Sequence, residues 1–337
     1  MEYDVAIVGA SFAGLAVASK LSGNILLIDR KEIGSHQASA CGTLVKTMEA
    51  VGCENSILQT FDKIAIHVGD DEITIPVSDR FCTIDYKKFC KTFFKQCSAK
   101  FMVANAYGVR GNEIITDKGN FRVKIIVDCS GWSAVLAKSI DNNYVKNDMM
   151  SFGIETEVPF EDDKLRFFLD KRIIGNGAAW LFPAGKKSRF GVGSYAGETK
   201  LLSNLGRLTN KYGVKTGKLH GGYFCYSFKR PCVGNIFVVG CAAGQTLPLS
   251  GEGIRRSITC GLKCGEILQQ ILDGKVSVKD GRKLYEDFAL KYKNRYNMLF
   301  HLQEKIHSIP NWGIKLIARL LSIRPIGDYM LSLYEEI

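Results

Sequence analysis

The N-terminal part of the chain alternates between hydrophobic runs and a segment of small residues. Residues 5–8 are apolar and largely β-branched, and residues 25–28 are again apolar, so each run predicts a buried strand of a parallel sheet. Between the two runs, the small residues that begin at Gly9 favour a helix. The order strand, helix, strand is typical of an α/β fold.

Further elements are predicted in the first 147 residues. The turn residues at 69–71 and 117–120 each separate two alternating segments, which predicts two hairpins. A third apolar run, 125–127, ends like the early strands in an acidic residue and a glycine turn, and it should belong to the same sheet. The pattern also predicts helices over residues 44–60 and 85–98 and a strand over residues 100–104.

Residues 148–228 have a different pattern, in which short alternating segments are separated by turn residues. This predicts a mainly antiparallel sheet with one helix near 199–212, and therefore a second domain inserted into the first. The parallel pattern resumes at 234–244 with a strand and a glycine turn, and a long helix should follow from 254 to about 272. Residues 279–337 are expected to be helical.

One of these C-terminal helices is predominantly apolar. Between Trp312 and Ile323, the polar side chains form only a narrow stripe that contains Lys315 and Arg319. Two interpretations are open: the helix packs on the protein, or its apolar face rests on a membrane surface. No run approaches the roughly 20 apolar residues that a membrane span needs.

A length of 337 residues suggests roughly two domains, and the composition, with 46% hydrophobic and 23% charged residues, is that of a globular protein. The formal charge of +11 favours anionic partners such as cofactor phosphates, phosphorylated substrates or acidic head groups. The basic residues are spread along the chain without a nucleic-acid-binding motif, so no nucleic acid is expected. The first strand begins at residue 3, which leaves no room for a signal peptide and predicts a cytoplasmic protein.

The chain is rich in cysteine, with 11 residues, but these include no Cys-x-x-Cys pair, and the five histidines show no metal-ligand spacing. We therefore expect no metal site. In a chain without a secretion signal, most thiols should be reduced and buried. Disulfides stay open as an alternative if the source organism is a hyperthermophile.

The first strand leads into a motif that suits a dinucleotide. Gly9 allows a tight turn, Gly14 lets the helix pack close to the strands, and the free N–H groups at the start of the helix can bind a pyrophosphate. Ser11 takes the place of the usual middle glycine and adds little bulk. Asp29, twenty residues after Gly9, can accept a hydrogen bond from a ribose hydroxyl. The alternative is an ordinary βαβ unit without a ligand.

Two later motifs complete a fixed order: Asp128-Cys-Ser-Gly-Trp-Ser133, and Gly240-Cys-Ala-Ala-Gly244 with Pro248-Leu-Ser-Gly-Glu-Gly-Ile254. With the N-terminal motif, this order resembles the FAD-dependent oxidoreductases built like para-hydroxybenzoate hydroxylase. The resemblance covers most of residues 1–275 and implies one FAD. In that superfamily the late motif usually reads Gly-Asp-Ala-Ala, and its acid bonds the ribityl chain. Here Cys241 stands at the acid position.

Two further features resemble the geranylgeranyl reductase family within that superfamily. Ala40-Cys41-Gly42 is similar to the cysteine-glycine loop of those enzymes. Ala178-Ala-Trp-Leu-Phe-Pro183 is similar to their Tyr-x-Trp-x-Phe-Pro motif, with Ala178 at the tyrosine position.

The fold class that follows is α/β, α+β overall: a Rossmann-like FAD-binding domain, an inserted mainly antiparallel-sheet substrate domain and a helical C-terminus. The hairpin at 61–80 is a candidate to join the substrate domain. The expected limits are 1–147 for the first part of the FAD-binding domain, 148–230 for the substrate domain, 231–275 for the second part of the FAD-binding domain and 276–337 for the C-terminal helical region.

The resemblance also implies roles for single residues. Cys41 would lie near the flavin, where it donates a proton or controls the position of the ring, although a lone cysteine can be inert. The expected substrate contacts, which would otherwise be sheet core, are Trp180, Phe182 and Pro183. The expected cofactor contacts are Gly9, Ser11, Phe12, Ala13, Gly14, Asp29, Arg30, Lys31, Ala40, Cys41, Gly42, Asp128, Gly131, Gly240, Cys241, Gly251, Gly253 and Ile254.

The implied activity is reduction of C=C bonds in the isoprenoid (geranylgeranyl) chain of a lipid or prenyl diphosphate, with FAD as cofactor and NAD(P)H or ferredoxin as external reductant. An isolated alkene has no polar handle, so an apolar, aromatic tunnel must position it. The expected location is cytoplasmic, with peripheral attachment to the inner face of the membrane as a further hypothesis. The alternatives are a flavin-dependent monooxygenase of the same superfamily and a non-redox flavin-binding polyprenoid cyclase.

Overall fold

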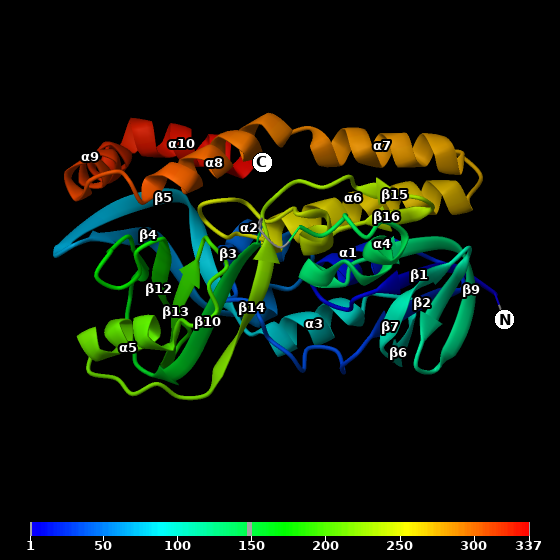
Figure 1. The fold of residues 1–337 in the computed structure, drawn as a ribbon, viewed down its shortest axis with the longest axis horizontal. Helices are drawn as coiled ribbons and strands as arrows, with labels where there is room; N and C mark the ends of the chain where they lie inside the picture. Colours follow the sequence, from blue (N-terminus) through cyan, green and yellow to red (C-terminus); the bar gives the residue numbers. More distant parts are fainter. Residues whose placement is uncertain (1, 147–149, 337) are drawn as a thin grey trace. The chain divides into compact units, whose positions relative to one another are not determined.

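The computed structural model describes residues 2–146 and 150–336, which form two compact units (Figure 1). The domain limit expected at residues 147 and 148 lies outside the described residues. The segment 37–85 belongs to the second unit and is longer than the 61–80 hairpin considered from the sequence. Unit 1 comprises Met1–His36, Tyr86–Asn147 and Phe224–Tyr296, and unit 2 comprises Gln37–Asp85, Asp148–Tyr223 and Asn297–Ile337.

Unit 1 is built on a sheet in which β1 (Glu2–Val8) is a central strand. It lies parallel to β2 (Ile25–Asp29) on one side and to β9 (Gly119–Asp128) on the other. The parallel sheet continues through β6 (Lys100–Val103) beside β2 and β16 (Ile236–Val238) beside β9. The inner strands are buried on both faces, which explains their hydrophobic runs. The α/β prediction is confirmed.

Helices cover this sheet (Figure 1), and two of them pack closely because of glycine. A Cβ atom on Gly261 of α6 (Ile254–Leu272) would lie 2.7 Å from the Cβ atom of Ala16 in α1 (Phe12–Ala18). The helix predicted from 254 to 272 is confirmed. The other elements of unit 1 are β7 (Ala106–Arg110), β8 (Glu113–Thr116), β15 (Cys232–Val233), α3 (Tyr86–Phe94), α4 (Val135–Ile140), α7 (Val278–Leu290) and 3-10 turns at Gly131–Ser133 and Gly240–Ala243, while α8 (Lys293–Ile306) begins in unit 1 and ends in unit 2.

Unit 2 contains a second sheet in the order β14-β10-β13-β12-β11-β4-β5-β3. The pair β11–β4 is parallel, whereas the pairs β10–β13, β12–β13, β11–β12, β4–β5 and β3–β5 are antiparallel, as the alternating segments predict. Leu205 and Leu208 of α5 (Leu202–Lys211) pack into the core formed with Phe190. The strands are β3 (Gly42–Leu44), β4 (Ile57–Val68), β5 (Asp71–Ile84), β10 (Met150–Pro159), β11 (Leu165–Phe168), β12 (Gly177–Pro183), β13 (Lys187–Ser194) and β14 (Leu219–Cys225).

The helix predicted over residues 44–60 is wrong for most of its length. Only α2 (Val45–Glu49) is an α-helix, and β4 already begins at Ile57. Gly52 has a positive φ of 60° and ends the helical segment. The residues that follow pair with β5, starting with Ile57 beside Ile84, so pairing with a strand later in the chain overrides the local pattern.

The C-terminal helices α9 (Asn311–Ser322) and α10 (Arg324–Glu336) pack against β5 in unit 2 (Figure 1). The buried side of α9 carries Ile314 and Ala318. An ion pair of 2.8 Å between Lys315 Nζ and Asp71 Oδ2 fixes the helix beside the end of the hairpin. None of the helices in the described part of the chain is long and apolar enough to cross a membrane.

Candidate functional site

The turn after β1 can be made only with glycine at two positions. Gly9 has a φ of +109°, and a Cβ atom on it would lie 2.1 Å from the Cys129 carbonyl oxygen. A Cβ atom on Gly14 would lie 1.7 Å from the carbonyl oxygen of Gly9. The side chain of Ser11 does not cap α1 but accepts a hydrogen bond from the Tyr86 hydroxyl at 2.9 Å. The backbone of this turn is therefore held tightly between neighbouring strand ends.

Asp29 lies beside this turn, at the end of β2. Its Oδ2 accepts a hydrogen bond from the backbone N–H of Ala10 at 2.7 Å, and its Oδ1 accepts one from Lys31 at 3.1 Å. The acid and the glycine turn that the sequence singles out are thus in direct contact. Arg30 and Lys31 follow with exposed side chains. The binding roles of these residues stay predictions.

Asp128 ends β9 and is completely buried. Its Oδ1 accepts from the backbone and hydroxyl of Ser130, and its Oδ2 accepts from the backbone N–H groups of Leu136 and Ala137, at 2.6 to 3.0 Å. Burial raises the pKa of this carboxyl, and the hydrogen bonds oppose that shift. The carboxylate therefore shapes the turn at Gly131 and the start of α4. A direct contact with a cofactor stays a prediction.

Cys241 lies in the turn after β16, beside Gly240, whose φ is +73°. Its sulfur accepts a hydrogen bond from the backbone N–H of Cys225 at 3.2 Å. Burial raises the pKa of the Cys241 thiol to about 11, so this side chain is neutral near pH 7. It offers no negative charge and is a weaker acceptor than the carboxylate usual at this position.

The third predicted glycine segment precedes α6. Gly251 has a φ of +67°. A Cβ atom on it would lie 3.6 Å from the Phe224 ring, which is an ordinary contact distance. A Cβ atom on Gly253 would lie 3.1 Å from Thr246 Oγ1, and Ile254 begins the helix. The turns at Gly9, Gly131 and Gly240 each follow a parallel strand of unit 1, where ligands of open α/β sheets bind.

In unit 2, Cys41 is completely buried and has a φ of +56°, which is unfavourable for a residue with a side chain. Its backbone N–H donates to Ser39 Oγ at 3.1 Å, and its carbonyl accepts from the N–H of Ile84 at 3.0 Å. Burial raises the pKa of the Cys41 thiol to about 12. The thiol is therefore protonated and is not an activated nucleophile.

Arg189 of β13 holds this loop in place, although the sequence did not identify it. Its side chain is almost fully buried, and it donates to the carbonyl oxygens of Ala40 and Ile84 at 3.1 Å each. It also donates to Glu157 at 3.3 Å. The guanidinium thus binds the backbone on both sides of the contact between Cys41 and Ile84.

The cysteine-glycine loop and the aromatic motif meet within unit 2. A Cβ atom on Gly42 would lie 2.9 Å from the Phe182 ring, and Ala40, Phe182 and Trp180 belong to one apolar cluster. A Cβ atom on Gly191 would lie 2.1 Å from the Trp180 ring, so β13 needs glycine there. Two glycines in one strand, Gly191 and Gly193, were the available signal for this close approach.

A polar pair that sequence analysis missed lies beside Trp180. The indole N–H donates to Glu155 Oε2 at 2.5 Å, and Glu155 Oε1 is 2.9 Å from Nε2 of His220. Glu155 is almost fully buried, whereas His220 is partly exposed. The orientation of Trp180 is therefore fixed by a buried carboxylate. Pro183, the last residue of the motif, is held separately, because its carbonyl accepts a hydrogen bond from the Thr83 hydroxyl at 2.6 Å.

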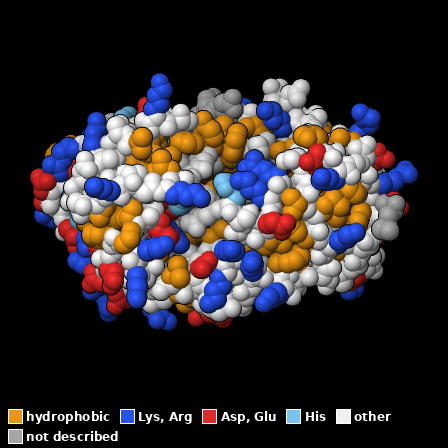
Figure 2. Space-filling model, turned by 90° about the horizontal axis from the view of Figure 1, so that it is seen from below, with side chains coloured by type: hydrophobic (Ala, Val, Ile, Leu, Met, Phe, Trp, Pro, Cys, Tyr) orange, Lys and Arg blue, Asp and Glu red, His pale blue; other side chains and the backbone are white. Residues whose placement is uncertain are grey.

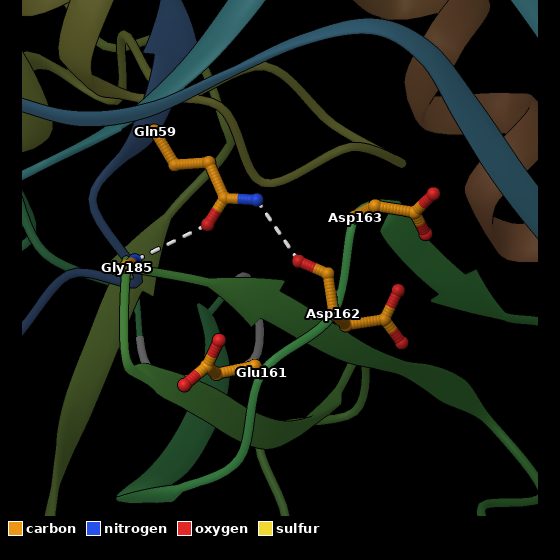
Figure 3. A pocket seen from close by; sticks show the side chains of 5 residues that line it. All are labelled: Gln59, Glu161, Asp162, Asp163 and Gly185. Carbon is orange, nitrogen blue, oxygen red and sulfur yellow. Dashed lines mark hydrogen bonds between the residues drawn. The ribbon is translucent and has the colours of Figure 1, made fainter.

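A separate hollow on unit 2 is lined by Gln59, Glu161, Asp162, Asp163 and Gly185 (Figure 3). The Gln59 amide accepts from the N–H of Gly185 at 3.2 Å and donates to the carbonyl oxygen of Asp162 at 2.9 Å. The hollow is acidic and shares no residue with the predicted site. Such a lining does not suit an isoprenoid chain.

The basic residues are also spread in space. Figure 2 shows Lys and Arg side chains across the visible face, interspersed with acidic and apolar side chains. The excess positive charge is therefore distributed over that face.

The chain is similar to known proteins over most of its length. No protein-family model matches it. A protein of Methanococcus vannielii named digeranylgeranylglycerophospholipid reductase is 26% identical over 329 residues, which cover 87% of this chain and 82% of the relative.

Solved structures share its fold. A geranylgeranyl bacteriochlorophyll reductase-like protein of Thermoplasma acidophilum superposes with a TM-score of 0.86, 18% identity, and coverage of 96% of this chain and 92% of that protein. The myxobacterial chondrochloren halogenase, a variant of FAD-dependent halogenases, superposes with a TM-score of 0.71 at 13% identity. The superposition covers 88% of this chain and 82% of the halogenase. The chain therefore has the fold of the FAD-dependent oxidoreductases and is a homologue of proteins named digeranylgeranylglycerophospholipid reductase.

Proposed function

We propose that the protein is an FAD-dependent reductase that saturates C=C bonds in the isoprenoid chains of lipids or prenyl diphosphates. The observation that carries this proposal is the similarity to a protein named digeranylgeranylglycerophospholipid reductase over 87% of the chain, an extent that includes parts of both units. The monooxygenase alternative has only the shared fold in its favour.

The residues of unit 1 fit the dinucleotide part of FAD. Gly9 and Gly14 allow a backbone turn that no larger residue could form, and Asp29 presents a carboxylate beside it. A Cβ atom on Gly131 would meet no atom within 4 Å, so the backbone there is open to a ligand. We infer that Ser11, Phe12 and Ala13, which continue from the turn, complete this part of the site. Cys241 would contribute a neutral contact.

FAD, when bound, supplies a hydride from its reduced ring. The protein must then hold an alkene in place and provide a proton. Trp180 is partly exposed and packs in one apolar cluster with the buried Phe182, so an aromatic surface is presented by Trp180, whose orientation is fixed by its hydrogen bond to Glu155. We propose that the isoprenoid chain lies along this surface. The positive net charge suits a phosphate-bearing head group.

Two groups in unit 2 are candidate proton donors. Cys41 keeps its proton because burial raises the pKa of its thiol to about 12, so it could act only as a neutral donor or by shaping the site. His220 is partly exposed and pairs with Glu155, which can orient its ring. We propose that His220 delivers the proton and that Cys41 positions the reacting groups.

The reductant and the location follow from the substrate class. We propose NAD(P)H or ferredoxin as the electron donor and peripheral attachment to the membrane, because a prenyl lipid resides in the bilayer. The decisive experiment is to purify the protein, record its flavin spectrum, reduce it anaerobically and add geranylgeranyl lipids. Flavin reoxidation together with a gain of hydrogen mass in the lipid is expected. Absence of both across several prenyl lipids would contradict the proposal.

One further measurement separates the alternatives, and two variants test the proposed residue roles. Oxygen uptake in step with substrate consumption would indicate a monooxygenase. Cys41→Ser should retain FAD and lose alkene turnover, and unchanged turnover would remove Cys41 from the mechanism. His220→Gln should slow the proton-dependent step and change the pH profile of turnover, while His301→Gln, which replaces an exposed histidine away from Glu155 and Trp180, serves as the control.

A further inference from the structure

The exposed hydrophobic side chains of this protein are concentrated near its C-terminus. Among the described residues, ten of the nineteen large hydrophobic side chains that are exposed lie between residues 298 and 330. We call these ten residues the C-terminal apolar surface. They are Met298, Leu302, Trp312, Leu316, Ile317, Leu320, Ile323, Ile326, Tyr329 and Met330.

Helix α9 is apolar on two sides. Its inner side buries Ile314 and Ala318 in unit 2, and these contacts are enough to hold the helix on the protein. Its outer side carries Trp312, Leu316 and Leu320, which follow at intervals of four residues and therefore share one face. Trp312 is 71% exposed, the highest value of the set. A helix that is apolar on both sides is typical of one that is buried a second time by another partner.

The charge around this surface selects the partner. The segment that carries this surface, residues 298–330, contains the four basic residues Lys305, Lys315, Arg319 and Arg324 and two acidic residues, Glu304 and Asp328. Lys315 is paired with Asp71, whereas Arg319 in the last turn of α9 and Arg324 at the start of α10 are exposed. A second copy that met this surface with its own would bring cations against cations. An anionic lipid surface instead satisfies the apolar and the basic groups together.

We propose that the C-terminal apolar surface docks on the anionic face of a lipid bilayer. Trp312, Leu316 and Leu320 would enter the boundary between head groups and acyl chains, and Arg319 and Arg324 would contact lipid phosphates. The proposal rests on the proposed function only in that it explains access to a lipid substrate. Binding itself requires no turnover, so the two can be tested separately.

The test uses the full-length protein and sedimentation with vesicles of phosphatidylcholine, with and without phosphatidylglycerol. We expect binding to the vesicles that contain phosphatidylglycerol, and a loss of binding at high salt. The triple variant Trp312→Ser, Leu316→Ser and Leu320→Ser should bind at least about tenfold more weakly. Arg319→Gln with Arg324→Gln should weaken binding to the anionic vesicles by about fivefold per residue.

The matched control is Leu202→Ser with Leu219→Ser, which removes two exposed leucines elsewhere on unit 2 and should bind like the wild type. Equal urea midpoints for all variants show that the fold is kept. Equal vesicle binding by the triple variant and the control would overturn the proposal. A concentration-dependent dimer that the triple variant abolishes, without vesicle binding by the wild type, would identify a second copy as the partner. Turnover of a detergent-solubilised prenyl substrate should be unchanged in the triple variant.

Discussion

Asp128 in unit 1 and Arg189 in unit 2 are buried ionisable side chains, one acidic and one basic, that hydrogen-bond mainly to the backbone. The carboxylate of Asp128 accepts three backbone N–H groups and one hydroxyl, whereas the guanidinium of Arg189 donates to two backbone carbonyls and to Glu157. Each fixes a loop that carries a predicted functional residue, Gly131 in one case and Cys41 in the other.

The two differ in how far along the chain their partners lie. The partners of Asp128 are within nine residues, but Arg189 reaches carbonyls that are 105 and 149 residues away. Asp128 therefore shapes a local turn, while Arg189 ties together strands that meet only in the folded protein. Long-range ties of this kind should matter for the site as much as for stability.

The largest expected effect is that of Asp128→Ala. It leaves the N–H groups of Ser130, Leu136 and Ala137 buried without an acceptor, which should lower the free energy of unfolding by about 4 kcal/mol. Urea denaturation measures this loss. Asp141→Ala, which removes a partly exposed partner of Arg230, should cost less than about 1 kcal/mol. Similar losses for both variants would contradict the structural role of Asp128.

Arg189→Met should have the next largest effect. It leaves the carbonyls of Ala40 and Ile84 without their donor and frees the loop of Cys41, at a cost of about 3 kcal/mol. The specific readout is the rate at which iodoacetamide alkylates Cys41 in the native protein, mapped by mass spectrometry. We expect this rate to rise in Arg189→Met and to rise less in Arg189→Lys. An unchanged rate would show that Arg189 does not hold the loop.

The third prediction concerns His67 of unit 2, a buried histidine that resists taking up a proton in the folded protein. Burial lowers its pKa from 6.5 to about 4, so the unfolded chain takes up the proton first as the pH falls below 6.5. The contribution of neutral His67 to the free energy of unfolding is therefore fully present above pH 6.5 and is lost as the pH falls towards 4. It amounts to about 2 kcal/mol between roughly pH 7.5 and pH 5.

His67→Gln should remove this part of the pH dependence, measured as urea midpoints across that range. His301→Gln is the matched control, because His301 is exposed. If both variants retain the slope of the wild type, His67 does not account for it.

The smallest expected effect concerns the strand end next to Asp128. Cys241→Asp introduces the acid that the resemblance leads one to expect at this position and should tighten FAD binding by about tenfold, through a hydrogen bond to a charged acceptor. Quenching of flavin fluorescence on titration measures this affinity, with Cys241→Ser as the uncharged control. Equal affinities for the two variants would mean that position 241 does not contact the cofactor.

Local patterns predicted much of the fold. The parallel strands could be recognised because burial on both faces requires continuous apolar runs, and the two hairpins because their turn residues are specific. The strand that begins within segment 44–60 could not be recognised, because it forms by pairing with residues near Ile84. Elements that depend on a partner later in the chain leave little trace in their own residues.

The same distinction applies to the candidate site. Gly9, Gly14 and Asp29 lie in one short motif, in which Gly14 packs against Gly9 and Asp29 accepts a hydrogen bond from Ala10, so their spacing indicated the turn. His220 and Glu155 are 65 residues apart and come together only through the pairing of β14 with β10. No local spacing marks such a pair.

The interleaving of the two units has a consequence for synthesis of the protein. Unit 1 needs its last segment, Phe224–Tyr296, and unit 2 needs Asn297–Ile337. Among the described strands, β16 is the last to join the sheet of unit 1, so β1 and β2 must wait for β9 and β16 with apolar edges uncovered, and the sheet of unit 2 receives α9 and α10 later still. We therefore expect the nascent chain to be prone to aggregation until these segments have emerged.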